Sequence, residues 1–429
     1  MIEMKDSGIE WIGEIPAHWA VKRLKDVSIL NPSYNGCDLE GDVSFVPMES
    51  LRCGQIDLQE ISFSEAKGKY TFFAKEDLLV AKVTPCFENG NIALAKNLKQ
   101  GIGFGSSEIF VLRCIGVLNK YLFYYSFSNE FQGRACSTMC GVGGLKRISP
   151  LFMRTHQLAI PPLAEQQTIA DYLDKKTAEI DEQITALEKK SDAYQRLKRS
   201  LISEVVTRGL NPTAELKDSG IEWIGEIPAH WVVKRLKDIA DLGSGTTPKS
   251  SNEKYYDGTH PWLITGDVQN RLIERNENFI TDLALADIPN LKLYPAKTVL
   301  LAMYGGGTIG NVGLMTYPAY INQACCAMIP KSGIYEKYLF YYLRTKYSRI
   351  ISTGVGGTQI NLSQNKIAAY PIAVPPFKEQ QAIADYLDKK TAEIDGNISA
   401  ISSKIDAYKR LKQSLIDEVV TGKRRIERA

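Results

Sequence analysis

Several stretches resemble catalytic or phosphate-binding motifs, but each lacks a part that the chemistry needs. GSGTTPKS (243–250) has the length of a phosphate-binding loop, yet Pro248 stands where that loop requires glycine. Proline has no backbone N–H to offer a phosphate, so we interpret the stretch as a turn. NPSY (31–34) lacks the second proline of the motif in which amino-methyltransferases hold a flipped adenine, and no glycine-rich cofactor loop is evident nearby.

Metal-binding and nucleophilic patterns are similarly incomplete. Cys136 and Cys140 form a CxxxC pair, but no second pair or nearby histidine completes a tetrahedral site. We therefore expect no metal site, and reduced, mostly buried thiols. His18 and His230 recur without a repeated nucleophile or carboxylate cluster, so we expect them to pack or to form hydrogen bonds. The sequence predicts no catalytic residues.

Binding is the better-supported activity, because glycine-rich stretches lie beside basic, amide and hydroxyl side chains. Glycine lets a backbone approach phosphate closely, while Arg and Lys suit guanine edges and Asn and Gln suit adenine. The same stretches could be ordinary tight turns. The predicted DNA-binding residues are Lys82, Thr84, Asn89, Lys146 and Arg147 in the first half, and Tyr304, Thr308, Thr358, Gln359, Asn361 and Lys366 in the second.

The sequence repeats internally, in the order variable stretch, near-identical segment, and then both again. KDSGIEWIGEIPAHW occurs at 5–19 and, unchanged, at 217–231. PPLAEQQTIADYLDKKTAEID (161–181) returns as PPFKEQQAIADYLDKKTAEID (375–395). KYLFYY also recurs, and we expect an aromatic helix packed in each core, with base stacking as the alternative. In each repeat, near-identical segments flank a variable stretch. This pattern predicts a framework with two equivalent ends, each of which carries a different binding surface.

A long helix follows each double proline, and each helix has an apolar position every three or four residues. This heptad spacing predicts an antiparallel coiled coil between the two helices, each about 45 residues long. The alternative is two separate helices, each packed on its own domain. The predicted seam residues are Ile180, Ile184, Leu187, Tyr194 and Leu201 in the first helix, and Ile394, Ile398, Ile401, Ile405, Tyr408 and Leu415 in the second.

The composition limits the class of protein. The chain has 429 residues, of which 44% are hydrophobic and 24% charged, typical of a globular protein with two to four domains. No apolar run of about 18 residues appears, and the N-terminus lacks the pattern of a signal peptide. We therefore expect a cytoplasmic protein. The net charge of +3 is weak support for any partner.

With these repeats, the chain resembles the specificity subunit of type I restriction-modification systems over essentially its full length. The resemblance rests on the paired GxIPxxW motifs that end at Trp19 and Trp231, and on the PPLAEQQ and PPFKEQQ helix starts. The segments MYGGGTIGNVGL (303–314) and INQACC (321–326) also contribute. The first half lacks the glycine run of YGGGTIGN, which makes its base-contacting residues harder to place.

The resemblance implies a mixed α/β fold with a pseudo-twofold internal repeat, in which two globular target recognition domains are separated by the coiled coil. The implied domains are 1–160 (first target recognition domain), 161–210 (first spacer helix), 211–374 (second target recognition domain) and 375–429 (second spacer helix and tail). The implied partners are double-stranded DNA with an asymmetric bipartite site, two methyltransferase subunits, and restriction subunits that join the full complex. The chain itself would hold no cofactor, while S-adenosylmethionine, ATP and Mg would belong to the partners.

Two other hypotheses remain open at this point. The chain could be a stand-alone methyltransferase or nuclease, which requires that the isolated chain bind a cofactor or a metal. It could also be a coiled-coil scaffold with no DNA role. The scaffold hypothesis predicts that exchange of residues 232–370 leaves DNA preference unchanged.

Overall fold

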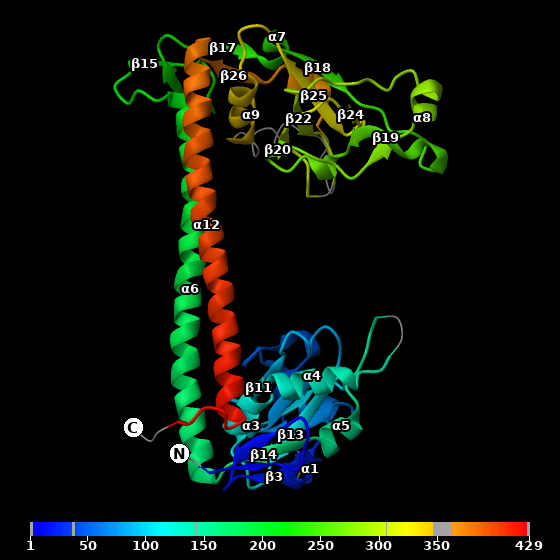
Figure 1. Ribbon diagram of the computed structural model, residues 1–429, viewed down its shortest axis with the longest axis vertical. Coiled ribbons are helices and arrows are strands. Elements are labelled where there is room, and N and C mark those ends of the chain that lie inside the picture. The colour runs from blue at the N-terminus through cyan, green and yellow to red at the C-terminus, as the bar shows by residue number, and fades with distance from the viewer. Residues whose placement is uncertain (1–2, 37–38, 142–143, 306, 346–361, 427–429) are drawn as a thin grey trace. The chain divides into compact units, whose positions relative to one another are not determined.

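A computed structural model describes residues 3–36, 39–141, 144–305, 307–345 and 362–426, and the chain divides into two compact units (Figure 1). Unit 1 comprises Met1–Glu188 with Ser402–Ala429, and unit 2 comprises Lys189–Ile401. Each unit therefore contains a globular α/β part and a portion of each of two long helices.

The long helices are α6 (Leu163–Arg208, 46 residues) and α12 (Phe377–Val420, 44 residues). Each begins directly after a double proline, whose fixed φ suits a helix start, and no proline interrupts either helix. Both end near a glycine with positive φ, Gly209 at 76° and Gly422 at 76°, a conformation that L side chains rarely adopt.

The predicted seam positions are the ones that avoid solvent in the middle of each helix. From Asp181 to Ser200, every residue of α6 is exposed except Ile184, Leu187, Ser191, Tyr194 and Lys198. From Asp395 to Leu411, every residue of α12 is exposed except Ile398, Ile401, Ile405 and Tyr408. The flanking residues Ile180, Leu201, Ile394 and Leu415 are also buried or half-buried. One apolar stripe on each helix is therefore covered.

Two equivalent ion pairs join α6 and α12. In unit 1, Lys412 Nζ lies 2.7 Å from Asp181 Oδ2, and in unit 2, Lys198 Nζ lies 2.5 Å from Asp395 Oδ2. Lys198 corresponds to Lys412 in the repeat, and Asp181 corresponds to Asp395. The first half of each helix thus meets the second half of the other, so the helices run antiparallel. Each repeat gives its lysine to the other repeat's aspartate, the exchange expected of twofold symmetry.

The globular part of unit 1 is built mainly on two four-stranded sheets. The antiparallel sheet has the order β11-β10-β13-β4, and the other sheet, in which β12 and β5 are parallel, has the order β8-β5-β12-β9. These strands are β4 (Ser28–Leu30), β5 (Asp42–Val46), β8 (Gln59–Ser62), β9 (Thr71–Ala74), β10 (Leu78–Ala81), β11 (Ile92–Leu94), β12 (Ile102–Gly105) and β13 (Ile109–Cys114). Short helices α3 (Asn119–Tyr125), α4 (Asn129–Ser137) and α5 (Pro150–Thr155) follow.

Unit 2 repeats this two-sheet plan, but its sheets have five and three strands. Its larger sheet has the order β18-β25-β22-β23-β20, and its smaller sheet has the order β21-β19-β24. The strands are β18 (Ala240–Ser244), β19 (Tyr256–Leu263), β20 (Leu272–Ile273), β21 (Phe279–Ile280), β22 (Val299–Ala302), β23 (Val312–Met315), β24 (Tyr320–Ile321) and β25 (Cys325–Pro330). The described short helices of unit 2 include α8 (Asp282–Asp287), α9 (Glu336–Thr345) and α11 (Gln364–Ala368). Together, the units confirm the predicted mixed α/β class and the internal repeat.

The identical segments hold each domain to the start of its long helix. Gln166 of α6 is buried, and its side chain accepts from the Leu118 N–H (2.7 Å) and donates to the Pro161 carbonyl (2.8 Å). Gln380 of α12 makes the matching bonds to Tyr335 and Pro375. The amide side chain therefore ties the chain before α3 or α9 to the turn that starts the long helix.

The histidines of the opening motif form hydrogen bonds, as expected. His18 Nε2 lies 2.7 Å from Glu165 Oε2, and His230 Nε2 lies 2.7 Å from Glu379 Oε2. These carboxylates belong to the two EQQ segments, so each opening motif is joined to a long-helix start by the same contact. The repeated sequence therefore forms the same contact in both units. We call this region, where the opening motif meets the start of the long helix, the framework joint.

The recurrent KYLFYY segment forms the buried helices α3 and α9, which confirms its predicted place in the core. The Tyr121 hydroxyl is fully buried and bonds to the carbonyls of Ala159 (2.9 Å) and Val420 (3.0 Å), and Tyr338 makes the matching bonds to Ala373 and Val206. Tyr121 thereby joins the first globular part to the end of α12, the helix of the other repeat.

The expectation of mostly buried cysteines is wrong in unit 1. The described cysteines are all free thiols, but Cys53 and Cys140 are exposed and only Cys325 and Cys326 are fully buried. The reason is local, because Cys53 lies in a turn and Cys140 in an isolated β-bridge, while the buried pair lies in β25, an interior strand of its sheet.

The start of α4 packs against the end of α12 through polar contacts. Asp417 Oδ1 accepts from the Asn129 N–H at 2.8 Å, and the Gln413 amide donates to the Phe127 carbonyl. Beside them, burial raises the pKa of Glu130 to about 7, although a hydrogen bond from the Tyr125 hydroxyl opposes the shift. A carboxylic acid is thus held close to its midpoint at neutral pH.

Substitution of Ile398 by Asp is expected to destabilise the paired helices. The change places an unpaired charge on the half-buried seam, which should cost roughly 3 kcal/mol. Thermal unfolding followed by circular dichroism measures the loss. The exposed neighbour Ala400, changed to Asp, is the matched control and should unfold close to the wild type. Equal melting temperatures for I398D and wild type would show that Ile398 is not in the seam.

Replacement of Glu130 by Gln is expected to flatten the pH dependence of stability. A carboxyl whose pKa is raised on folding contributes stability that is present below the unfolded pKa of about 4.3 and is lost as the pH rises through 7. Wild-type stability should therefore fall relative to that of E130Q between pH 5 and pH 8, as measured by urea unfolding at several pH values. Exposed Glu10, changed to Gln, is the control. Parallel curves for wild type and E130Q would contradict the assignment.

Candidate nucleic-acid interface

In unit 1, the structure brings together four of the residues predicted to bind DNA. Lys82 and Thr84 directly follow β10, and Lys146 and Arg147 precede α5. The Thr84 N–H donates to the Lys146 carbonyl (3.0 Å), and the Lys146 N–H donates to the Thr84 hydroxyl oxygen (2.9 Å). Two segments about 60 residues apart in the sequence are thereby held side by side through hydrogen bonds of their backbones.

Hydroxyl and backbone groups complete this ladder. The Thr84 hydroxyl donates to the Gly144 carbonyl at 3.0 Å, and Arg147 forms isolated β-bridges with Val83 and Cys140. Asn89 is exposed in the turn that follows, where its N–H donates to the Pro85 carbonyl at 2.9 Å. Lys146 and Arg147 are exposed, so their cationic groups can meet a ligand from solvent.

Charge in this cluster is arranged around one carboxylate. Arg147 donates to Glu108 through Nε (2.9 Å) and Nη2 (2.8 Å), and this hydrogen-bonded pair holds the pKa of Glu108 below its usual range. Lys82 donates through Nζ to the Ser107 carbonyl and lies 4.6 Å from the centre of the Phe110 ring. Partial burial lowers the pKa of Lys82. Two cations, Arg147 and Lys82, thus act on one carboxylate, and Lys146 adds a third positive charge to the cluster.

In unit 2, Tyr304 and Thr308 lie in the glycine-rich loop between β22 and β23. Gly305 has φ of 120° and Gly307 has φ of 84°, conformations that require glycine. The Thr308 N–H donates to the Gly305 carbonyl at 3.3 Å, which folds the loop back on itself. Both side chains are half-buried.

The segment that enters α11 lies against this loop. The Leu362 N–H donates to the Met303 carbonyl at 2.9 Å, and Ser363 caps the helix by accepting from the Lys366 N–H. Exposed Lys366 therefore lies in the first turn of a helix whose preceding residue Leu362 is bonded beside Tyr304. Thr358, Gln359 and Asn361 lie outside the described residues, so their part in this surface stays a prediction.

Sequence reasoning did not include the residues around 321–324, which lie beside this loop because the Met303 N–H donates to the Ala324 carbonyl at 2.8 Å. Thr246 N–H donates to the Ile321 carbonyl (3.0 Å), and the Thr247 hydroxyl donates to Gln323 Oε1. Thr265 lies beside Gly305, close enough that a Cβ there would contact its hydroxyl. Glycine and threonine in GSGTT, and the amides in INQACC, were the available signals. The rejected phosphate-loop motif thus contributes to the same cluster without a phosphate-loop fold.

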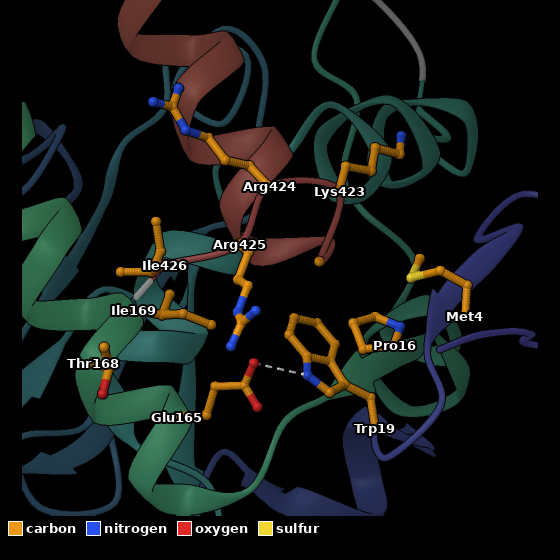
Figure 2. Close-up of a pocket in the computed structure, with 11 residues that line it drawn as sticks. Met4, Pro16, Trp19, Glu165, Thr168, Ile169, Lys423, Arg424, Arg425 and Ile426 are labelled. Atoms are coloured by element: carbon orange, nitrogen blue, oxygen red, sulfur yellow. Dashed lines mark hydrogen bonds between the residues drawn. The ribbon is translucent and has the colours of Figure 1, made fainter. Parts of the chain in front are cut away.

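Unit 1 also contains a cavity of about 340 Å³, at the joint where α12 ends (Figure 2). Trp19 Nε1 donates to Glu165 Oε1 at 3.2 Å on one side, and the tail residues Lys423, Arg424 and Arg425 line the other. Figure 2 shows Arg425 directed toward Glu165. The lining comes from the opening motif, the α6 start and the tail. The cavity therefore belongs to the framework joint, and it includes none of the residues predicted to bind DNA.

The part of the chain that the structure describes offers neither a metal-binding cluster nor a membrane-spanning helix. Among those residues, no group of three or more His, Cys, Asp or Glu side chains is placed to hold a metal ion. Within the same residues, no helix has the length and apolar character needed to cross a membrane.

Comparison with known proteins places the chain in a family. The family model described as the type I restriction modification DNA specificity domain matches residues 16–189 and again 228–405. The two matches cover most of the chain and follow its internal repeat. The chain belongs to this family.

Curated relatives include specificity subunits from bacteria and an archaeon. The chain is 33% identical over 198 residues to the type I restriction enzyme EcoAI specificity subunit of Escherichia coli. That match spans 44% of this chain and about a third (33%) of the relative's own length. The MjaVIII specificity subunit of Methanocaldococcus jannaschii is 25% identical, with 96% of this chain and 94% of the relative covered.

Solved structures share the fold. A chain from a study of complex assembly and conformational transition of the type I R-M system matches with a TM-score of 0.77 at 18% identity, covering 95% of this chain and 98% of that chain. The HsdS subunit from Thermoanaerobacter tengcongensis matches with a TM-score of 0.55 at 19% identity, with the same coverage. At these identities, the likeness concerns the fold alone.

Proposed function

We propose that this chain is the DNA-recognition subunit of a type I restriction-modification complex and that it recognises an asymmetric bipartite DNA site. The observation that carries the proposal is the double match to the DNA specificity domain, once in each repeat. Two equivalent domains on one framework suit two half-sites, one for each unit.

The different chemistry of the two loop clusters supports an asymmetric site. Unit 1 presents Lys82, Lys146 and Arg147, whereas the described cluster of unit 2 combines hydroxyl and amide groups such as Thr308 and Gln323 with the single cation Lys366. Cationic forks suit guanine and phosphate, and amides suit adenine. The two half-sites should therefore differ in sequence.

Two copies of a methyltransferase subunit are the proposed partners of the long helices. Each helix has an exposed stripe next to its seam that is identical in the two repeats, although neighbouring exposed positions differ, such as Gln195 and Lys409. Leu197 and Leu411 occupy equivalent positions in the two stripes, and each is 52% exposed, so each offers a partner the same apolar contact. The stripe consists of Lys190, Ala193, Leu197, Ser200 and Glu204 in unit 2, and Lys404, Ala407, Leu411, Ser414 and the half-buried Glu418 in unit 1.

The chain is proposed to act without catalytic residues, in the cytoplasm where its DNA lies. Its partners would supply methyl transfer from S-adenosylmethionine to adenine, and restriction subunits would supply ATP- and Mg-dependent translocation and cleavage. The alternative of a stand-alone enzyme requires cofactor binding by the isolated chain. Calorimetric titration of the isolated chain with S-adenosylmethionine tests that alternative directly.

A modification map of the genome tests the proposed function. Long-read sequencing with and without this gene, beside its methyltransferase gene, should show one split N6-methyladenine motif that disappears with the gene. Exchange of residues 232–370 for another such domain should change one half of that motif and leave the other half intact. A motif unaffected by the deletion, or one that survives the exchange unchanged, would contradict the proposal.

Substitution of the exposed leucines tests the docking stripe. Leu197→Arg and Leu411→Arg should each remove one methyltransferase copy from the complex, and the double variant should remove both, because a charge replaces an apolar contact. Native mass spectrometry of the co-expressed complex counts the copies. Gln195→Lys, which introduces the residue that the other repeat carries, is the matched control and should retain both copies. Full stoichiometry in the double variant would place the docking surface elsewhere.

A further inference from the structure

The ion pair between Arg147 and Glu108 leaves part of the guanidinium available. Arg147 donates to the carboxylate through Nε and Nη2, at 2.9 and 2.8 Å. The guanidinium is planar and has five N–H donors, so the edge formed by Nη1 and the second Nη2 hydrogen faces away from Glu108. A guanine accepts two such donors at O6 and N7 in the major groove. The pair therefore has the geometry to hold a carboxylate on one edge and a guanine on the other.

Both partners stand on fixed backbone. Arg147 exchanges two backbone hydrogen bonds with Cys140, at 2.9 and 3.1 Å. Glu108 is held at its carbonyl by the Lys82 N–H (2.9 Å) and at its N–H by the Ser106 hydroxyl (3.2 Å). A side chain already held in one direction loses less conformational entropy when it binds. The arginine is thus pre-organised from both ends.

Stability does not explain this pair. The side chains of Arg147 and Glu108 are 47% and 31% exposed, and exposed ion pairs contribute only about 0–1 kcal/mol to folding. A carboxylate also opposes binding to a polyanion, so its presence amid Lys82, Lys146 and Arg147 weakens general attraction to DNA. Glu108 therefore weakens general DNA binding without adding much stability. A role in orienting the Arg147 side chain explains why it is there.

The second repeat differs at this position. GVGGLKR (141–147) aligns with GVGGTQI (354–360), so Ile360, which lies outside the described residues, stands where the first repeat has Arg147. The second repeat therefore has no arginine at the position of Arg147.

We propose that Arg147 reads a guanine in the half-site of unit 1 and that Glu108 is the positioning residue that aims it. The inference rests on the proposed DNA-recognition function and deepens it. It assigns one base pair to one side chain, and it gives the buttressing carboxylate a role in specificity.

The test uses the complete chain in complex with its methyltransferase partner. Competition binding with a panel of oligonucleotides, each changed at one base pair of the first half-site, measures discrimination position by position. Arg147→Ala should reduce discrimination at a single G·C pair by roughly tenfold or more. Glu108→Gln should reduce discrimination at the same pair while leaving the other positions intact. Because the two residues act through one contact, the double variant should resemble Arg147→Ala alone.

A matched control separates base reading from phosphate contact. Lys146→Ala should weaken binding to every oligonucleotide by a similar factor and reduce the slope of log K against log salt by about one. If Arg147→Ala behaved in the same uniform way, or if the effects of Glu108→Gln and Arg147→Ala simply added, the inference would be overturned while DNA recognition stood. A wild-type complex that bound all oligonucleotides equally would overturn the proposed function as well.

Discussion

Two apolar stripes that neither long helix can bury alone determine how this protein is built. A helix of about 45 residues gains little from propensity and must cover its apolar face by packing. The seam gives each helix the other as partner, and the ion pairs select the direction. In a parallel, in-register pair, Lys198 would face Lys412 and Asp181 would face Asp395, which would repel. Each pair joins a half-buried lysine to an exposed aspartate, and ion pairs near the surface contribute about 0–1 kcal/mol each. Their effect is therefore on orientation more than on stability.

The contacts between the repeated segments and the long helices explain why some parts of the sequence are repeated and others are not. Glu165, Gln166 and Tyr121 each contact a different element of unit 1, and Glu379, Gln380 and Tyr338 make the equivalent contacts in unit 2. These joints need the same residue types wherever they occur. The loops between strands make few such contacts, so their composition is free to differ between the units. A domain with a different DNA specificity can therefore attach to the long helices through the same contacts.

Much of this architecture could be predicted because it depends on local pattern. Heptad spacing indicated which residues of α6 and α12 avoid solvent, and the double prolines marked where the helices begin. The loop clusters were predicted less completely. Thr247 and Gln323 are 76 residues apart, and a sheet topology, not a motif, brings them together. Glu108 was missed for the same reason, since its partner Arg147 is distant in sequence and ordinary in type. The cysteines were predicted to be mostly buried because cysteine usually is, but Cys53 and Cys140 are exposed. An average tendency to be buried does not determine the exposure of a particular residue.

The participation of α12 in unit 1 has a consequence for how the chain is made. Leu415, Ile416 and Val419 belong to the core of unit 1, and Asp417 holds the start of α4. During synthesis, these residues leave the ribosome more than 200 residues after the rest of that core. Unit 2, whose residues 189–401 are all made before them, can close first. The earlier half of the protein therefore waits, with an uncovered apolar surface, for the later half to be translated, and this interval is when the nascent chain most needs protection from aggregation.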